Sequence, residues 1–212
     1  MIDKESELKL IFNSLQKNNI SYMVLRGFDE IPEDVTYNND LDLLCKKNDQ
    51  KKIQQIFSDL KYKFYQDSLL HHTYLYAALP HQHFRNKNKD LHIDIVYNLS
   101  YKSPNKGEWV SIHEDLQQSI WHNKRKVDNF WSFQPSHHDE LMHIICHSIF
   151  DKQEFREKYI LRIKQLFPLS NHYQLKQDLE LIFFKYTSSL LEQIKKEQFD
   201  QIIINYLTFK EY

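Results

Sequence analysis

The stretch Asp40-Leu41-Asp42-Leu43-Leu44-Cys45 decides how this sequence is interpreted. It begins by alternating acidic and apolar residues, which is typical of a β-strand with one buried face. Asp40 and Asp42 are two residues apart and therefore leave the same face of the strand, whereas Leu41 and Leu43 point to the other. Carboxylates held this close repel each other unless a cation neutralises them. The stretch therefore predicts a strand that presents an acidic pair.

Two further predicted strands flank this stretch in the sequence. Residues 20–25 are short and β-rich and end at Arg26-Gly27, and a loop leads from there to Asp40. Residues 91–96 alternate over their whole length and place Asp94 between two isoleucines. If this strand lies beside residues 40–45, three carboxylates converge into an oxygen-rich site of the kind that suits Mg²⁺. An Asp-x-Asp pair alone is common without function, so the interpretation depends on the combination.

The composition excludes several function classes. The 212 residues include only two glycines, Gly27 and Gly107, so the dinucleotide fingerprint, the Walker A loop and the kinase phosphate loop cannot be built. A net charge of −1 argues against binding nucleic acid by bulk charge. Two isolated cysteines make neither a disulfide framework nor a zinc site. With no membrane-span-length apolar run and no secretory signal at the start, we expect a cytoplasmic location.

Hydrophobic periodicity divides the chain into two halves. We expect an α+β fold, with a small mixed-sheet α/β domain over residues 1–100 and an all-helical accessory region over residues 101–212. Ser136, with Asp139 three residues later, is typical of a capping box that opens a helix. Further helices are expected at 4–18, after Asn48 or Asp49 as N-cap, and at 113–122, 154–167 and 172–209. Further strands are expected at 62–66 and 72–79, and a turn at 81–89.

Together these motifs resemble the nucleotidyltransferase (polymerase β-like) superfamily. Its signature is a strand, a Gly followed by a small residue, a loop, an Asp-x-Asp pair and a third acid on a later strand. The matching residues are Leu25-Arg26-Gly27-Phe28, eleven further residues, Asp40-Leu41-Asp42-Leu43-Leu44, and His92-Ile93-Asp94-Ile95. Within the superfamily, Arg26 and the Asp-Leu-Asp-Leu-Leu string are most similar to the large, poorly characterised bacterial nucleotidyltransferase-like family.

The resemblance implies metal-dependent transfer of a nucleotidyl, or related phosphoryl, group from a nucleoside triphosphate to an acceptor hydroxyl. Asp40 and Asp42 would hold Mg²⁺ or Mn²⁺ on the donor's phosphates. Asp94 would help to bind a second metal and take the proton from the attacking hydroxyl. The acceptor is unidentified, and more distant kinship with phosphocholine transferases of surface glycans favours a sugar or glycan.

The same resemblance implies nucleotide-binding positions around the glycine. Backbone amides at Gly27 and Phe28 would approach the phosphates, and Arg26 would add a charge-assisted contact. Phe28 departs from the pattern, because a small residue normally follows this glycine. His92 shares a face with Asp94 and is a candidate helper base or phosphate contact. Lys152 and Lys158 are candidates because the helical region of this fold often supplies cations to the triphosphate.

The other histidines give weaker indications of function than His92. His143 and His147 share a helix face but lack the Glu of a zinc-protease motif, because Ile144 follows His143. Either they line the cleft with His137 and His138, or they are helix-face histidines that are partly buried. Four more flank a predicted turn and are expected to be solvated: His71, His72, His81 and His83.

Two other functions stay open. The chain can be a catalytically silent module of the same fold that binds a nucleotide or a partner, which Phe28 favours and the three carboxylates disfavour. It can also be a toxin-like enzyme that modifies tRNA or protein, although the balanced charge does not promise the basic groove that this requires.

Overall fold

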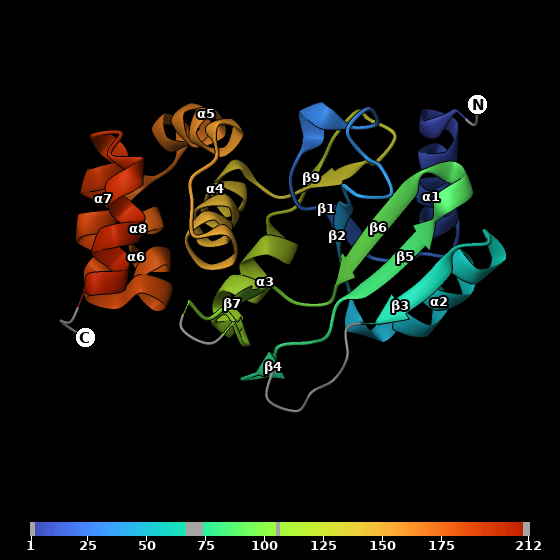
Figure 1. Ribbon diagram of the computed structural model, residues 1–212, viewed down its shortest axis with the longest axis horizontal. Helices are drawn as coiled ribbons and strands as arrows, with labels where there is room; N and C mark the ends of the chain where they lie inside the picture. Colours follow the sequence, from blue (N-terminus) through green and yellow to red (C-terminus); the bar gives the residue numbers. More distant parts are fainter. Residues whose placement is uncertain (1–2, 67–73, 105–106, 210–212) are drawn as a thin grey trace. The chain divides into compact units, whose positions relative to one another are not determined.

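The computed structural model describes residues 3–66, 74–104 and 107–209 (Figure 1). The chain forms two compact units. The first comprises Met1–Leu99 and Lys124–Pro135, and the second comprises Ser100–Asn123 and Ser136–Tyr212. The segment 124–135 thus returns to the first unit, a feature that the sequence-based division at residue 100 did not contain. In the described part of the chain, no helix is long and apolar enough to cross a membrane.

The first unit is built on a five-stranded mixed sheet in the order β1-β2-β6-β5-β3. The central pair, β2 and β6, is parallel, and the other neighbouring pairs are antiparallel. Segment 124–135 adds the antiparallel pair β9 and β10. The strands of this unit are β1 (Tyr22–Val24), β2 (Leu41–Cys45), β3 (Lys63–Gln66), β4 (Tyr74–Leu75), β5 (Gln82–Asn86), β6 (Leu91–Val96), β9 (Arg125–Lys126) and β10 (Phe133–Gln134).

Two helices cover one face of this sheet, α1 (Lys4–Lys17) and α2 (Gln50–Asp59) (Figure 1). Asp3 caps α1 by accepting a hydrogen bond from the Glu5 amide. The apolar side chains of both helices pack against alternate strand residues in one hydrophobic core. That core takes Leu41 and Leu43 of β2 and Ile93 and Ile95 of β6. Because strand side chains alternate between faces, Asp42 and Asp94 are left on the opposite face.

The second unit is mainly helical. Its helices are α3 (Glu114–His122), α4 (His137–Cys146), α5 (Glu157–Leu166), α6 (His172–Phe183), α7 (Thr187–Lys195) and α8 (Phe199–Thr208), and a π-helical segment, His147–Lys152, follows α4. Ser136 caps α4 by accepting a hydrogen bond from the Asp139 amide, as the capping box predicted. The unit also contains one antiparallel strand pair, β7 (Ser100–Lys102) with β8 (Trp109–Ser111), which the sequence did not predict.

The predicted α+β fold class is confirmed, as are most predicted elements. The turn predicted over residues 81–89 was wrong, because most of that stretch is β5. In the strand predicted over 72–79, only Tyr74–Leu75 is a strand among the described residues, and residues 72 and 73 lie outside them. His71 and His72 also lie outside the described residues.

Candidate active site

The register of the two parallel strands brings the three carboxylates together. Asp42 of β2 lies directly opposite Asp94 of β6, and Asp40 immediately precedes β2. One carboxylate oxygen from each lies within 4.8 Å of the others. Asp94 is buried, whereas Asp40 and Asp42 are partly exposed. The site is therefore an acidic cluster on the sheet face that the helices leave uncovered.

Arg26 is held against this cluster by the strand that precedes it. The Leu25 amide donates to the Asp42 carbonyl at 3.1 Å, which continues the β1–β2 ladder beyond Val24. Arg26 Nη2 then lies 2.8 Å from Asp42 Oδ2, and both side chains are mostly buried. The structure thus pairs Arg26 with Asp42, and the phosphate contact expected from the sequence stays a prediction.

Gly27 and Phe28 form the turn after β1. Gly27 has φ +73°, in the left-handed region that favours glycine. A Cβ there would meet Glu30 Oε2 at an ordinary 3.6 Å, so the backbone conformation and not space requires the glycine. Phe28 is buried and belongs to the hydrophobic core of the first unit. The ring that departs from the family pattern is thus accommodated in the core.

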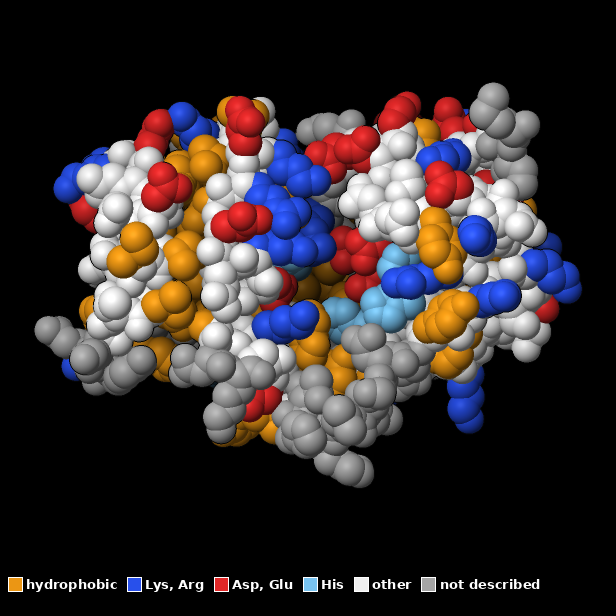
Figure 2. All heavy atoms as spheres, in the orientation of Figure 1, with side chains coloured by type: hydrophobic (Ala, Val, Ile, Leu, Met, Phe, Trp, Pro, Cys, Tyr) orange, Lys and Arg blue, Asp and Glu red, His pale blue; other side chains and the backbone are white. Residues whose placement is uncertain are grey.

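Three histidines surround Asp94. His81 Nδ1 lies 3.3 Å from Asp94 Oδ2, and His83 Nδ1 lies 3.4 Å from Asp94 Oδ1. His83 Nδ1 and His92 Nε2 are 3.1 Å apart and share a hydrogen bond. Figure 2 shows histidine side chains gathered beside acidic side chains. The prediction that His81 and His83 are solvated was wrong, because His81 is buried and His83 is only partly exposed.

Comparison with known proteins shows the fold. No protein-family model and no curated protein sequence matches the chain. Among solved structures, the antibiotic-resistance factor ANT(2'')-Ia is similar with a TM-score of 0.50 and 10% identity, covering 91% of this chain and 96% of that one. The chain has the fold of the polymerase β-like nucleotidyltransferases. The lincomycin-bound lincosamide antibiotic adenylyltransferase LnuA aligns with a TM-score of 0.46 and 15% identity over 78% of this chain and 98% of its own.

At such identities the likeness concerns the fold alone, and the chemistry of the site depends on the chain's own residues. Burial raises the pKa of Asp42 to about 7, with Asp40 and Asp94 adding to the rise and Arg26 opposing it. Burial also pushes the pKa of Asp94 upward, but the hydrogen bond and charge of His81, with His83 and His92, bring it below its ordinary value. Burial lowers the pKa of His92 to about 4.

The cluster fits a divalent cation. Asp94 Oδ1 is buried and accepts no hydrogen bond from any residue in the described part of the chain. An orphaned carboxylate oxygen of this kind costs stability unless it finds a proton or a cation. The pKa of Asp42 is raised first by burial, and the charges of Asp40 and Asp94 add to the rise. Both observations indicate that the described side chains alone do not balance the negative charge.

Sequence reasoning missed a polar strand face at this site. His81, His83 and Arg85 alternate with Gln82 and Phe84, and Phe84 packs in the core. Arg85 lies opposite His92 in the ladder, and its guanidinium carbon lies 5.7 Å from the centre of the Tyr37 ring. The alternation was available as a signal, but the polar residues outnumber the apolar ones and resemble a turn.

The remaining candidates belong to the second unit. Lys152 ends the π-helical segment, and the Lys158 ammonium lies 5.6 Å from the centre of the Tyr159 ring. His143 bonds to the Tyr101 hydroxyl at 2.8 Å and His147 to Asp151 at 2.9 Å, and both imidazoles are buried. His138 bonds to Asp178 at 2.8 Å. Each of these hydrogen bonds joins two residues of the second unit.

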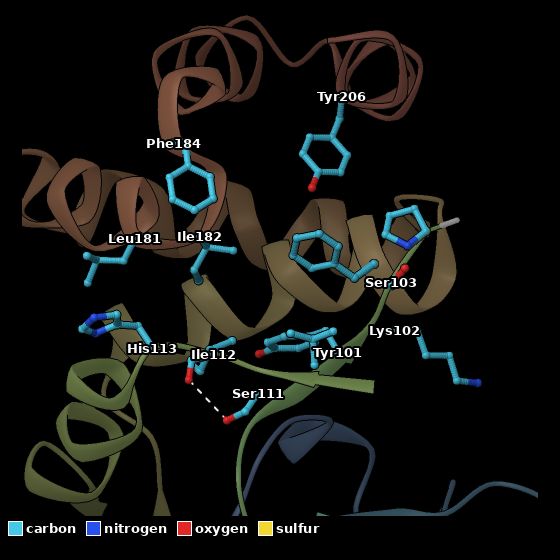
Figure 3. A pocket seen from close by; sticks show the side chains of 13 residues that line it. Tyr101, Lys102, Ser103, Ser111, Ile112, His113, Leu181, Ile182, Phe184 and Tyr206 are labelled. Atoms are coloured by element: carbon cyan, nitrogen blue, oxygen red, sulfur yellow. Dashed lines mark hydrogen bonds between the residues drawn. The ribbon is translucent and has the colours of Figure 1, made fainter. Parts of the chain in front are cut away.

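The second unit also has a half-open pocket of about 310 Å³ (Figure 3). Rings of Tyr101, Phe150, Phe184 and Tyr206 contribute to its wall, and Ser111 and Lys102 add polar groups. The lining is mainly apolar, and the volume lies at the lower end of the range found for sites that bind small organic molecules.

Proposed function

We propose that this protein is a divalent-cation-dependent nucleotidyltransferase that acts on a hydroxyl of a small molecule. The observation that carries the proposal is the convergence of Asp40, Asp42 and Asp94 around an orphaned Asp94 oxygen. The nucleotidyltransferase fold supports the proposal, because the signature of that superfamily likewise has an Asp-x-Asp pair and a third acid on a later strand. Asp40 and Asp42 would hold Mg²⁺ or Mn²⁺, with Asp94 as a further ligand.

When bound, the cation neutralises charge on the donor's phosphates and makes the α-phosphorus more electrophilic. Arg26 contacts Asp42 Oδ2 at 2.8 Å, and its guanidinium can exchange this carboxylate oxygen for a phosphate oxygen of the donor. Gly27 turns the backbone at the strand end with a φ of +73°, which favours glycine. These residues orient the donor, and the chain performs no covalent chemistry itself.

The transfer step forms one bond to phosphorus, breaks another, and moves one proton to a residue of the first unit. The acceptor oxygen forms a bond to the α-phosphorus, the bond from that phosphorus to the bridging oxygen of the leaving group breaks, and pyrophosphate departs. Asp94 Oδ1 accepts the proton of the attacking hydroxyl, since no described residue donates to that oxygen. His81 contacts the other oxygen of Asp94 and holds the carboxylate in position.

A small-molecule acceptor is supported by the fold that the chain shares with the antibiotic-resistance factor ANT(2'')-Ia. A sugar or glycan acceptor, which the sequence resemblance favoured, is compatible with transfer to a hydroxyl. A charge of −1 offers no support for a tRNA acceptor.

A second candidate function is a silent nucleotide-binding module. The observation in its favour is the ion pair of Arg26 with Asp42, which occupies one of the carboxylates. The other support for this alternative, the bulk of Phe28, is weakened because that ring lies in the core.

The test incubates the protein with each nucleoside triphosphate, labelled at either the α- or the γ-phosphorus, and a small-molecule cell extract in Mg²⁺ or Mn²⁺. We expect the α-label to enter a new product with release of pyrophosphate, and Asp94→Asn to abolish it. Asp115→Asn, at an exposed position, is the matched control. Transfer of the γ-label would replace nucleotidyl by phosphoryl transfer, and nucleotide binding without any transfer would favour the silent module.

A further inference from the structure

A second set of ligand atoms shares Asp40 with the carboxylate cluster. Atoms of Asp40, His83 and His92 lie within 4.8 Å of one another, just as atoms of Asp40, Asp42 and Asp94 do. His83 lies on β5 and His92 on β6, on the sheet face opposite the core. The two sets differ in chemistry, because one offers three oxygens and the other offers one oxygen and two imidazole nitrogens.

The two nitrogens already have the separation that a shared cation requires. His83 Nδ1 and His92 Nε2 are 3.1 Å apart. Two nitrogens bound about 2.1 Å from one metal are about 3.0 Å apart at right angles and about 3.4 Å apart in tetrahedral geometry. Neutral imidazoles that meet through these atoms can share one proton, as here, or both can face one metal ion.

An independent observation points to the same place. Asp94 is 95% buried (5% exposed), and its Oδ1 accepts no hydrogen bond from the residues that the structure describes. That oxygen lies 3.4 Å from His83 Nδ1 and so faces the pair of nitrogens. A cation beside His83 would therefore meet an oxygen that otherwise stays unsatisfied.

We propose that Asp40, His83 and His92 bind a divalent cation of the first transition series, such as Mn²⁺, Co²⁺ or Zn²⁺, next to the all-oxygen cluster. Imidazole is a good ligand for these ions, whereas Mg²⁺ prefers oxygen ligands and retains several waters. The fold would thus carry two adjacent cation positions of unlike donor chemistry that share one carboxylate. This binding needs only residues of the first unit and does not depend on the proposed function.

The test titrates Co²⁺ into the full chain, free of a polyhistidine tag and stripped with EDTA, without nucleotide. We expect visible absorption bands of nitrogen-ligated Co²⁺ that saturate with one ion and persist in excess Mg²⁺. His83→Gln and His92→Gln should each lower the Co²⁺ affinity at least about tenfold. His122→Gln, at an exposed position, should bind as the parent does.

A second measurement avoids variants that might unfold. In the wild-type chain labelled with ¹⁵N, Zn²⁺ should shift the ring signals of His83 and His92 and leave His138, which pairs with Asp178, unchanged. Retention of full Co²⁺ affinity in His83→Gln and His92→Gln, or ring signals that ignore Zn²⁺, would overturn the proposal. Neither experiment measures transfer, so failure of the proposed function leaves these outcomes unchanged.

Discussion

Replacement of Asp42 by Asn is expected to stabilise the cation-free protein at pH 8, although it breaks an ion pair. In the folded chain the pKa of Asp42 is about 7 against an ordinary 3.8, because of burial and the neighbouring Asp40 and Asp94. The folded state therefore binds more protons than the unfolded state between these values. The contribution of Asp42 to the free energy of unfolding therefore falls as the pH rises from about 4 to about 7, and it stays constant above about pH 7.

The size of the effect follows from the same values. A pKa difference of about 3 corresponds to about 4 kcal/mol for holding Asp42 ionised at pH 8. Asn carries no charge and avoids this cost, but it leaves Arg26, with a side chain 18% exposed, without its carboxylate. The attraction of Arg26 already lowers the pKa of Asp42, so the loss of the pair is contained in this figure. The expected gain is therefore about 4 kcal/mol, or about 12 °C in Tm for a chain of this length.

The assay is thermal unfolding in EDTA across pH 4 to 8, with Asp115→Asn as a control for an exposed carboxylate. The Asp42→Asn advantage should grow between pH 4 and 7 and then stay constant. Mg²⁺ or Mn²⁺ should stabilise the wild type and remove the difference. An Asp42→Asn protein that is less stable than the wild type at pH 8 in EDTA would refute the reasoning, because Asp42 would then be a net stabilising partner of Arg26.

Three further predictions concern the surroundings of the site and the second unit. Arg26→Gln removes the cation that opposes the rise in the pKa of Asp42, so the pH midpoint of Mn²⁺ binding, measured by calorimetry, should move upward, and Arg26→Lys should restore it in part. Gly27→Ala forces a side chain into φ +73° and should lower the free energy of unfolding, measured in urea, by about 1 kcal/mol. Gly27→Asn should lower it by less, and equal stability of the wild type and both variants would contradict the conformational argument. Glu140→Gln removes the charge of a buried carboxylate to which the partly exposed Arg162 donates at 2.6 and 2.9 Å, so the free energy of unfolding should fall by about 3 kcal/mol. Glu192→Gln, in an exposed pair, should lower it by under about 0.5 kcal/mol.

The elements that position the carboxylates could be predicted because their signals are local. Asp40 and Asp42 follow from two-residue alternation, and Asp94 from a strand in which every second residue is apolar. The helix faces of α1 and α2 follow from apolar spacing. In each case the spacing of apolar residues over a few positions determines which face of the strand or helix packs in the core.

The rest depended on pairing between distant strands. The β5–β6 register sets His83 against Asp94, and no local pattern specifies that register. The ion pair of Arg26 with Asp42 likewise depends on how β1 continues beside β2. Segment 124–135 returns to the first unit through contacts such as that of Phe133 with Tyr22, whose ring centres are 5.6 Å apart. Such contacts join residues far apart in the chain, where sequence patterning carries little information.

The central claim is that Asp40, Asp42 and Asp94 hold a cation that binds the phosphates of a nucleoside triphosphate. Calorimetric titration of ATP into the wild type and Asp42→Asn, each in Mg²⁺ and in EDTA, tests this without knowledge of the acceptor. The account predicts ATP binding to the wild type in Mg²⁺, and its loss both in EDTA and in the folded Asp42→Asn variant. Equal ATP affinity in EDTA, or full affinity in Asp42→Asn, would contradict it.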